Sequence, residues 1–95
     1  MKIIALENEN PGATAEQLKK WSKAEALKAW ELQQAGFIRE VYFRSDENSA
    51  VLVLEADSVD EANKKLEDLP LVRNGLIRFE LIPLKAYPGF ERLFS

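Results

Sequence analysis

Glu25 is the residue whose type and position most clearly point to chemistry. It lies in a predicted helix, on a side whose other members are mostly apolar: Leu18, Trp21, Ala29 and Leu32. A carboxylate on the core-facing side of a helix either pairs with a positive group or has an acid–base role. Glu25 is therefore the candidate catalytic residue. The structural alternatives are an ion pair with Lys28 and a side chain that reaches past the helix edge to water.

The sequence contains no cysteine and no histidine, which narrows the chemistry further. Without cysteine there are no disulfides and no thiolate nucleophiles. Without histidine the commonest general base and the commonest metal ligand are both missing. No phosphate-binding loop or nucleophile motif is present either. Any chemistry must then use carboxylate, Tyr, Lys, Arg or backbone groups, and no metal-ligand cluster is present.

Length and composition predict one domain, residues 1–95, of ordinary globular character. Hydrophobic residues make up 46% of the chain and charged residues 31%. The net charge is −3 and the lysines and arginines are scattered, so we expect no nucleic-acid partner. No apolar run is long enough to span a membrane and no signal-peptide core begins the chain, so we expect a cytoplasmic protein without membrane contact.

The hydrophobic patterns predict the order strand, helix, strand, strand, helix, strand. The strands are expected at 2–7, 37–44, 50–55 and 77–84, and the helices at 14–35 and 58–68. Thr14 and Ser58 each begin a capping box, Gly36 is a natural helix stop and Pro70 is expected to end the second helix. This order is typical of the ferredoxin-like α+β fold, a four-stranded antiparallel sheet with two helices on one face.

The third strand is apolar on both faces, although the helices can cover only one face of the sheet. A second copy of the sheet is the simplest cover for the other face. We therefore expect a homodimer, with the aromatic tail at 86–95 clamping the partner subunit.

Several segments together carry a resemblance to a known family. They are Lys23-Ala-Glu-Ala26, Leu32-Gln-Gln-Ala-Gly36, Asp57-Ser-Val-Asp-Glu61, Leu69-Pro-Leu71 and Tyr87-Pro88. In this order and spacing they resemble the muconolactone isomerase family of the dimeric α+β barrel superfamily, from about residue 18 to residue 88.

The resemblance implies an enzyme that shifts a proton across an unsaturated γ-lactone without a metal or an organic cofactor. It also implies subunits that assemble into dimers and larger rings around a small-molecule site. Glu25 matches a family glutamate and would be the acid–base residue. The family pattern has histidine at the positions of Glu40 and Tyr87, and lysine at the position of Ser22.

A set of substrate-binding candidates follows from the same resemblance. Arg39, Tyr42 and Arg44 are candidates to hold an oxyanion or a substrate carboxylate, although they lie on different faces of one strand. Glu40, Tyr87 and Trp21 complete the set.

Other interpretations stay open. Trp21 can be a core or subunit-contact residue, and the charges at 39, 40 and 44 can form cross-strand ion pairs with Arg78 and Glu80. At the level of function, the alternative is a non-catalytic small-molecule-binding or stress-related homodimer. A cofactor-free oxygenase of the same superfamily is a third hypothesis, disfavoured because such enzymes usually rely on a pocket histidine.

Overall fold

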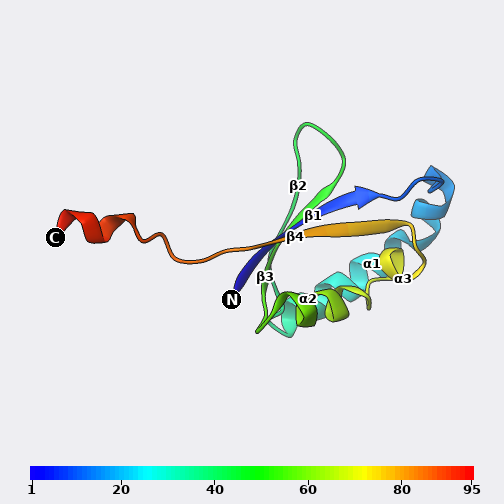
Figure 1. The fold of residues 1–95 in the computed structure, drawn as a ribbon. Coiled ribbons are helices and arrows are strands. Elements are labelled where there is room, and N and C mark those ends of the chain that lie inside the picture. The colour runs from blue at the N-terminus through cyan, green and yellow to red at the C-terminus, as the bar shows by residue number, and fades with distance from the viewer.

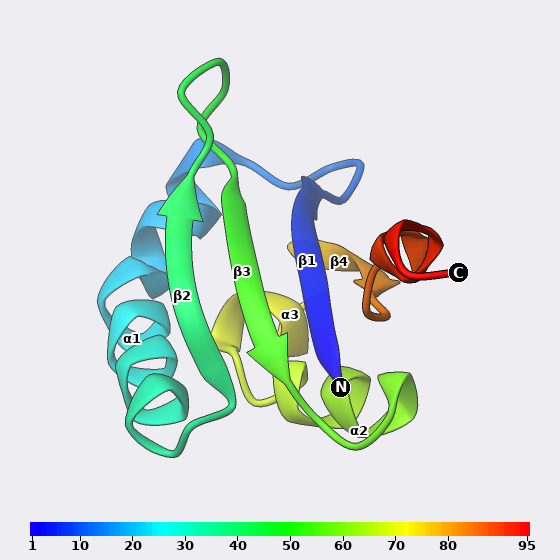
Figure 2. The same ribbon diagram turned by 90° about the vertical axis from the view of Figure 1, so that its left-hand side faces the viewer.

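The sheet contains four antiparallel strands, as the sequence predicts. In the computed structural model, which describes all 95 residues, the strands are β1 (Lys2–Glu9), β2 (Ile38–Phe43), β3 (Ala50–Glu55) and β4 (Ile77–Pro83). Their order in the sheet is β2-β3-β1-β4 (Figure 2). This order places the first and third strands at the centre, which is the ferredoxin-like arrangement.

The two long helices begin and end close to their predicted positions. Helix α1 (Ala15–Gln34) begins after a complete capping box, in which Gln17 N–H donates to Thr14 Oγ1 at 3.2 Å and Thr14 N–H donates to Gln17 Oε1 at 3.1 Å. It ends before Gly36, whose φ of 85° is a conformation that favours glycine. Helix α2 (Val59–Leu66) is capped by Ser58, but the Glu61 carboxylate accepts from Asp57 N–H rather than completing the second box.

The structure adds two short helices that the sequence patterns do not predict. Pro70 does not only end the preceding helical segment: it also begins α3 (Pro70–Arg73). Proline is favoured at the first helical position because its missing N–H would have no partner there. The second addition is a 3₁₀ helix, η1 (Gly89–Leu93), within the C-terminal tail.

Helices α1, α2 and α3 all lie on one face of the sheet (Figures 1 and 2). The core between the layers is apolar, and its largest fully buried side chains are Ile3, Ile38, Leu54 and Leu69. Burial of each such side chain contributes roughly 1.5–3 kcal/mol. Helix α1 has no fully buried residue, so it is seated less deeply than α2.

The strand order overturns the predicted cross-strand ion pairs. Strands β2 and β4 form opposite edges of the sheet, so Arg39, Glu40 and Arg44 cannot pair with the charges of β4. Arg78 of β4 instead donates to the backbone of Glu9 and to the side chain of Asn10.

Strand β2 also departs from strict alternation. A β-bulge between Ile38 and Glu40 shifts its register against β3. Because the extra residue reverses the side-chain alternation, Ile38 lies on the same face as Val41 and Phe43 instead of opposite them. Strict alternation would place Ile38 on the face opposite Val41 and Phe43, and it fails at the start of this strand.

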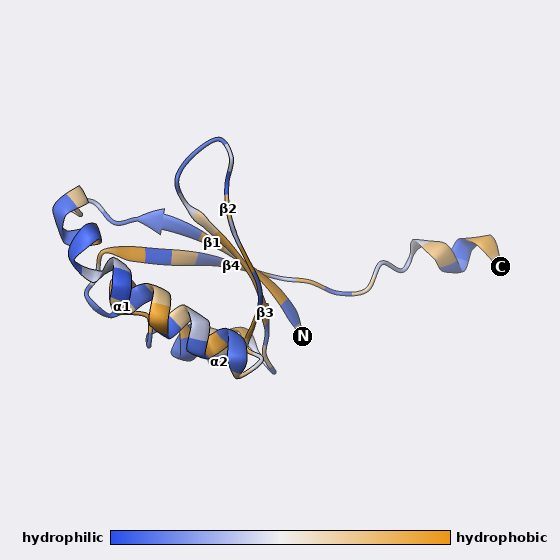
Figure 3. Ribbon diagram, turned by 180° about the vertical axis from the view of Figure 1, so that it is seen from behind, coloured by the Kyte–Doolittle hydropathy of each residue, from blue (hydrophilic) through white to orange (hydrophobic).

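The C-terminal tail extends away from the domain (Figure 1). Its own packing is local: the rings of Tyr87 and Phe90 meet edge to face at 5.0 Å between centroids. Figure 3 shows that hydrophobic residues alternate with polar ones along its last turns. Phe90, Leu93 and Phe94 are exposed there. No helix of the protein has the length and apolar character needed to cross a membrane.

Candidate functional site

A cavity of about 620 Å³ lies between α1 and the helix-covered face of the sheet. This volume falls in the range of small-molecule sites, roughly 300–1,000 Å³. Of its 19 lining residues 12 are hydrophobic, so the wall is mostly apolar. The polar members are few: Glu7, Glu9, Lys19, Ser22, Glu25, Gln33 and Asn48.

Small side chains on α1 explain why this space stays open. Ser22, Ala26 and Ala29 line the cavity from the helix, and their spacing of four and three residues places them on one helical face. Across from them, Ala50 of β3 is small as well. At the rim, Trp30 and Phe43 are 58% and 67% exposed, so apolar surface continues out to the solvent.

Glu25 lies on the cavity wall, half-buried, where the sequence analysis predicts chemistry. Its Oε1 accepts a hydrogen bond from the backbone N–H of Leu71 at 2.9 Å. The predicted alternative, an ion pair with Lys28, is not formed, because Lys28 pairs with Glu31. Burial raises the pKa of the Glu25 carboxyl above its usual value; the Leu71 N–H opposes this and the charge of Glu7 adds to it.

Glu7 is a second half-buried carboxylate on the same wall, and the sequence analysis did not single it out. Its Oε1 accepts the backbone N–H of Ala50 at 2.7 Å. Burial raises its pKa, the Ala50 bond lowers it and the charge of Glu9 raises it. The sequence does contain a signal for Glu7. Ile3, Ala5 and Glu7 are alternate residues of β1, so their side chains lie on the same face of the sheet, the face that the helices cover.

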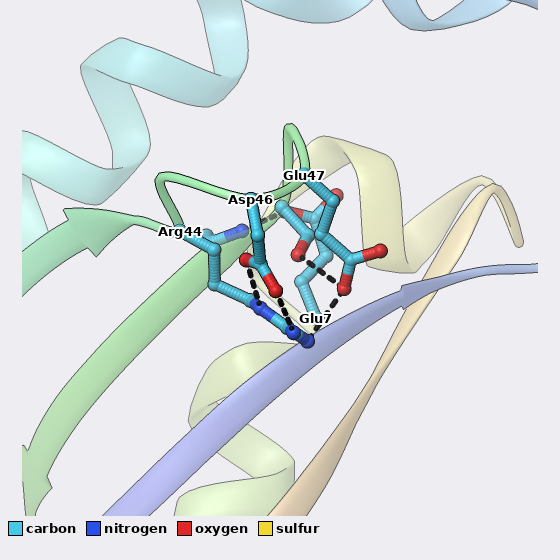
Figure 4. A network of polar contacts seen from close by, with 6 residues as sticks. Glu7, Arg44, Asp46 and Glu47 are labelled. Carbon is cyan, nitrogen blue, oxygen red and sulfur yellow. Dashed lines mark hydrogen bonds and ion pairs between the residues drawn. The ribbon is translucent and has the colours of Figure 1, made fainter.

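The cation that follows β2, close to the Glu7–Ala50 contact, is already neutralised. Arg44 binds Asp46 through two hydrogen bonds, at 2.9 and 2.6 Å, and also pairs with Glu47. Figure 4 shows this network at the hairpin between β2 and β3, with Glu7 beside it. Arg44 does not line the cavity, so it offers no free positive charge to a ligand there.

Like Arg44, the other five predicted substrate-binding residues lie outside the cavity of the single chain. Arg39 donates to the carbonyl of Gly36, and Tyr42 donates to Glu40 at 2.5 Å, which raises the pKa of the Tyr42 phenol. Tyr87 belongs to the extended tail, and the Trp21 ring lies 5.5 Å below the Lys20 ammonium. A binding role for these five residues stays a prediction, while Glu25 is the one predicted site residue on the cavity wall.

Comparison with known proteins decides the family. The muconolactone delta-isomerase family model matches residues 3–89, which is nearly the whole chain. The chain belongs to this family. No curated protein sequence matches it significantly.

Two solved structures resemble this muconolactone delta-isomerase family member over its whole fold. A muconolactone isomerase structure has a TM-score of 0.74 at 20% identity, covering 94% of this chain and 93% of that one. The 5-chloro-2-hydroxyhydroquinone dehydrochlorinase from Burkholderia phenoliruptrix, in complex with 2,5-dihydroxybenzoquinone, has a TM-score of 0.72 at 18% identity. That match covers 94% of this chain and 98% of the dehydrochlorinase. At such identities the likeness establishes the shared fold.

The polar groups of this family member's cavity allow proton transfer and hydrogen bonding. Two carboxylates with raised pKa values can accept and return protons. Lys19, Gln33 and Asn48 supply side-chain donors on the same wall. No group of three or more Asp or Glu side chains is arranged to hold a metal ion.

Proposed function

We propose that this protein is a cofactor-independent isomerase that moves a proton within a small unsaturated lactone or related acid, with Glu25 as the proton carrier. The observation that carries the proposal is the environment of the Glu25 carboxylate. The carboxylate is half-buried on the wall of an apolar cavity and forms no ion pair, and burial raises its pKa towards the working range of a general base.

The reaction needs only one carboxylate on one face of the substrate. In muconolactone, whose double bond is conjugated with the lactone carbonyl, the Glu25 carboxylate removes a proton from the ring carbon at the far end of that conjugated system, and the electron pair of the broken C–H bond forms the dienolate. The protonated Glu25 exchanges its proton with the solvent and then delivers a proton to the carbon beside the carbonyl, two carbons away, where a new C–H bond forms and the double bond is left shifted. Atoms and charge balance without an oxidant, a reductant or a cofactor.

The dienolate oxygen requires donors aimed at it while its charge develops. Lys19, Gln33 and Asn48 are the cavity residues that can donate, from the first turns of α1, from its last turn and from the β2–β3 hairpin. They replace Arg39, Tyr42 and Arg44 in our proposal, because those three lie outside the cavity.

The test is proton NMR of muconolactone and simpler unsaturated lactones in D₂O. We expect the wild type to incorporate deuterium into the lactone and Glu25→Gln to lose this activity. Glu31→Gln is the matched control, because Glu31 is an exposed glutamate of the same helix and should leave exchange unchanged. Absence of exchange with every lactone would refute the isomerase and favour the non-catalytic binding protein.

Self-association is the second part of the proposal. On the face of the sheet without helices, Ile4 pairs with Val53 and Ile82, and Leu6 pairs with Val51, so an apolar strip is left without a covering layer. A second copy of the sheet, held by the aromatic tail, would cover it in a cytoplasmic homodimer. Sedimentation of the full chain and of residues 1–85 tests this: we expect a dimer that the shorter chain weakens, and a monomeric full chain would refute it.

A further inference from the structure

The charges on the cavity wall are unbalanced. Three glutamates line it, namely Glu7, Glu9 and Glu25, against a single lysine, Lys19. Both arginines that the sequence offered for a substrate carboxylate are bound elsewhere: Arg39 to a backbone carbonyl and Arg44 to two acidic side chains. A carboxylate ligand would therefore meet a wall that is negative and mostly apolar.

We infer that the cavity takes an uncharged ring compound that carries hydrogen-bond donors, and that Glu7 makes it reject the corresponding carboxylate. The inference rests on the proposed function, because it narrows the substrate of that site from lactones and acids to uncharged lactones or hydroxylated rings. Like charges brought together in a desolvated site cost binding, whereas a carboxylate oxygen accepts readily from a hydroxyl or amide group.

Glu7 and Glu25 have separable roles in this arrangement. Each holds one backbone N–H through Oε1, so each has a second carboxylate oxygen without a protein partner in the structure. Glu25 comes from the middle of α1 and Glu7 from β1, so a flat ligand between helix and sheet can meet both. Glu25 would transfer the proton while Glu7 would select the ligand.

A matched pair of ligands tests the inference without depending on turnover. Muconolactone and its carboxamide have the same ring and the same number of heavy atoms, but only the acid is charged at neutral pH. We expect isothermal titration calorimetry of the full-length wild type to show the carboxamide binding at least roughly tenfold more tightly. In Glu7→Gln, which keeps an oxygen for Ala50 N–H, this ratio should fall to within about threefold.

Glu31→Gln is the matched control, because it removes the same charge from the exposed side of α1. Glu31 pairs with Lys28 and does not line the cavity, so the ratio in this variant should equal that of the wild type. Equal affinity of the wild type for acid and carboxamide would overturn the inference, as would an unchanged ratio in Glu7→Gln. Binding of neither compound up to its solubility limit would overturn it too.

Failure of the proposed function gives a different result. If the carboxamide binds selectively but exchanges no deuterium in D₂O, the isomerase is refuted and the charge selection stands. If both compounds exchange deuterium and bind equally, the isomerase stands and the charge selection is refuted.

Discussion

Replacing Glu25 by alanine should destabilise the protein, whereas replacing it by glutamine should not. The backbone N–H of Leu71, the second residue of α3, donates to Glu25 Oε1, and α3 has no side-chain cap of its own because Leu69 is its cap residue. Glu25 thus caps this short helix from a position 46 residues away in the sequence. The same carboxylate then serves both the cavity and the fold.

The expected cost follows from the loss of that cap. Removing a side-chain cap costs about 0.5–2 kcal/mol, and leaving a part-buried N–H without a partner costs about 1–3 kcal/mol. For Glu25→Ala we therefore expect about 1–2 kcal/mol, which in a domain of this size lowers Tm by roughly 4–16 °C. Glutamine keeps an oxygen for Leu71 and removes a charge that burial disfavours, so Glu25→Gln should stay within about 0.5 kcal/mol of the wild type or exceed it.

Urea denaturation followed by circular dichroism, at one fixed protein concentration, measures both variants. Glu31→Ala and Glu31→Gln provide the control, because Glu31 is exposed on the same helix and its two variants report the difference in helix propensity alone. After that correction Glu25→Ala should be less stable than Glu25→Gln. Equal stability of the two would refute the cap, since it would mean that Leu71 N–H needs no partner from α1.

Two further predictions concern titration and backbone conformation. Because the folded pKa values of Glu7 and Glu25 are raised, the free energy of unfolding should rise as pH falls from neutral towards their unfolded pKa of about 4.3. Denaturation at several pH values should show a smaller rise in the free energy of unfolding for the double variant Glu7→Gln/Glu25→Gln than for the wild type. The same pH profile for both proteins would contradict this prediction. Gly36→Ala should cost about 1–2 kcal/mol in thermal denaturation, because φ is 85° there although no atom would clash with the added Cβ; an unchanged Tm would contradict this.

Much of the fold follows from local sequence signals. Thr14 with Gln17 determines where α1 begins and Gly36 where it ends, and both act within a few residues of themselves. The alternation of apolar residues places the strands in the same way. Local signals of this kind are sufficient for the order of elements, and the order favours the ferredoxin-like fold.

The remaining features depend on contacts between distant segments. The β-bulge beside Arg39 appears only when β2 pairs with β3, and it reverses which side chains reach the cavity. Helix α3 lacks a local cap, and its partner Glu25 is distant in sequence. The alternation along β1 is enough to predict that Glu7 lies on the helix-covered face of the sheet. Only the folded sheet places it on the same cavity wall as Glu25.

The absence of ion pairs at Glu7 and Glu25 is the strongest argument that this cavity is a functional site. Two carboxylates beside an apolar wall lower the stability of the folded state unless a cation balances them. Suitable cations exist in the chain: Lys28 is paired with Glu31, Arg44 is paired with Asp46 and Glu47, and Lys19 lines the same cavity without forming an ion pair. A carboxylate that is only structural would be expected to take such a partner. Acid–base chemistry instead requires a carboxylate with a raised pKa and a free oxygen, and both glutamates fit that requirement.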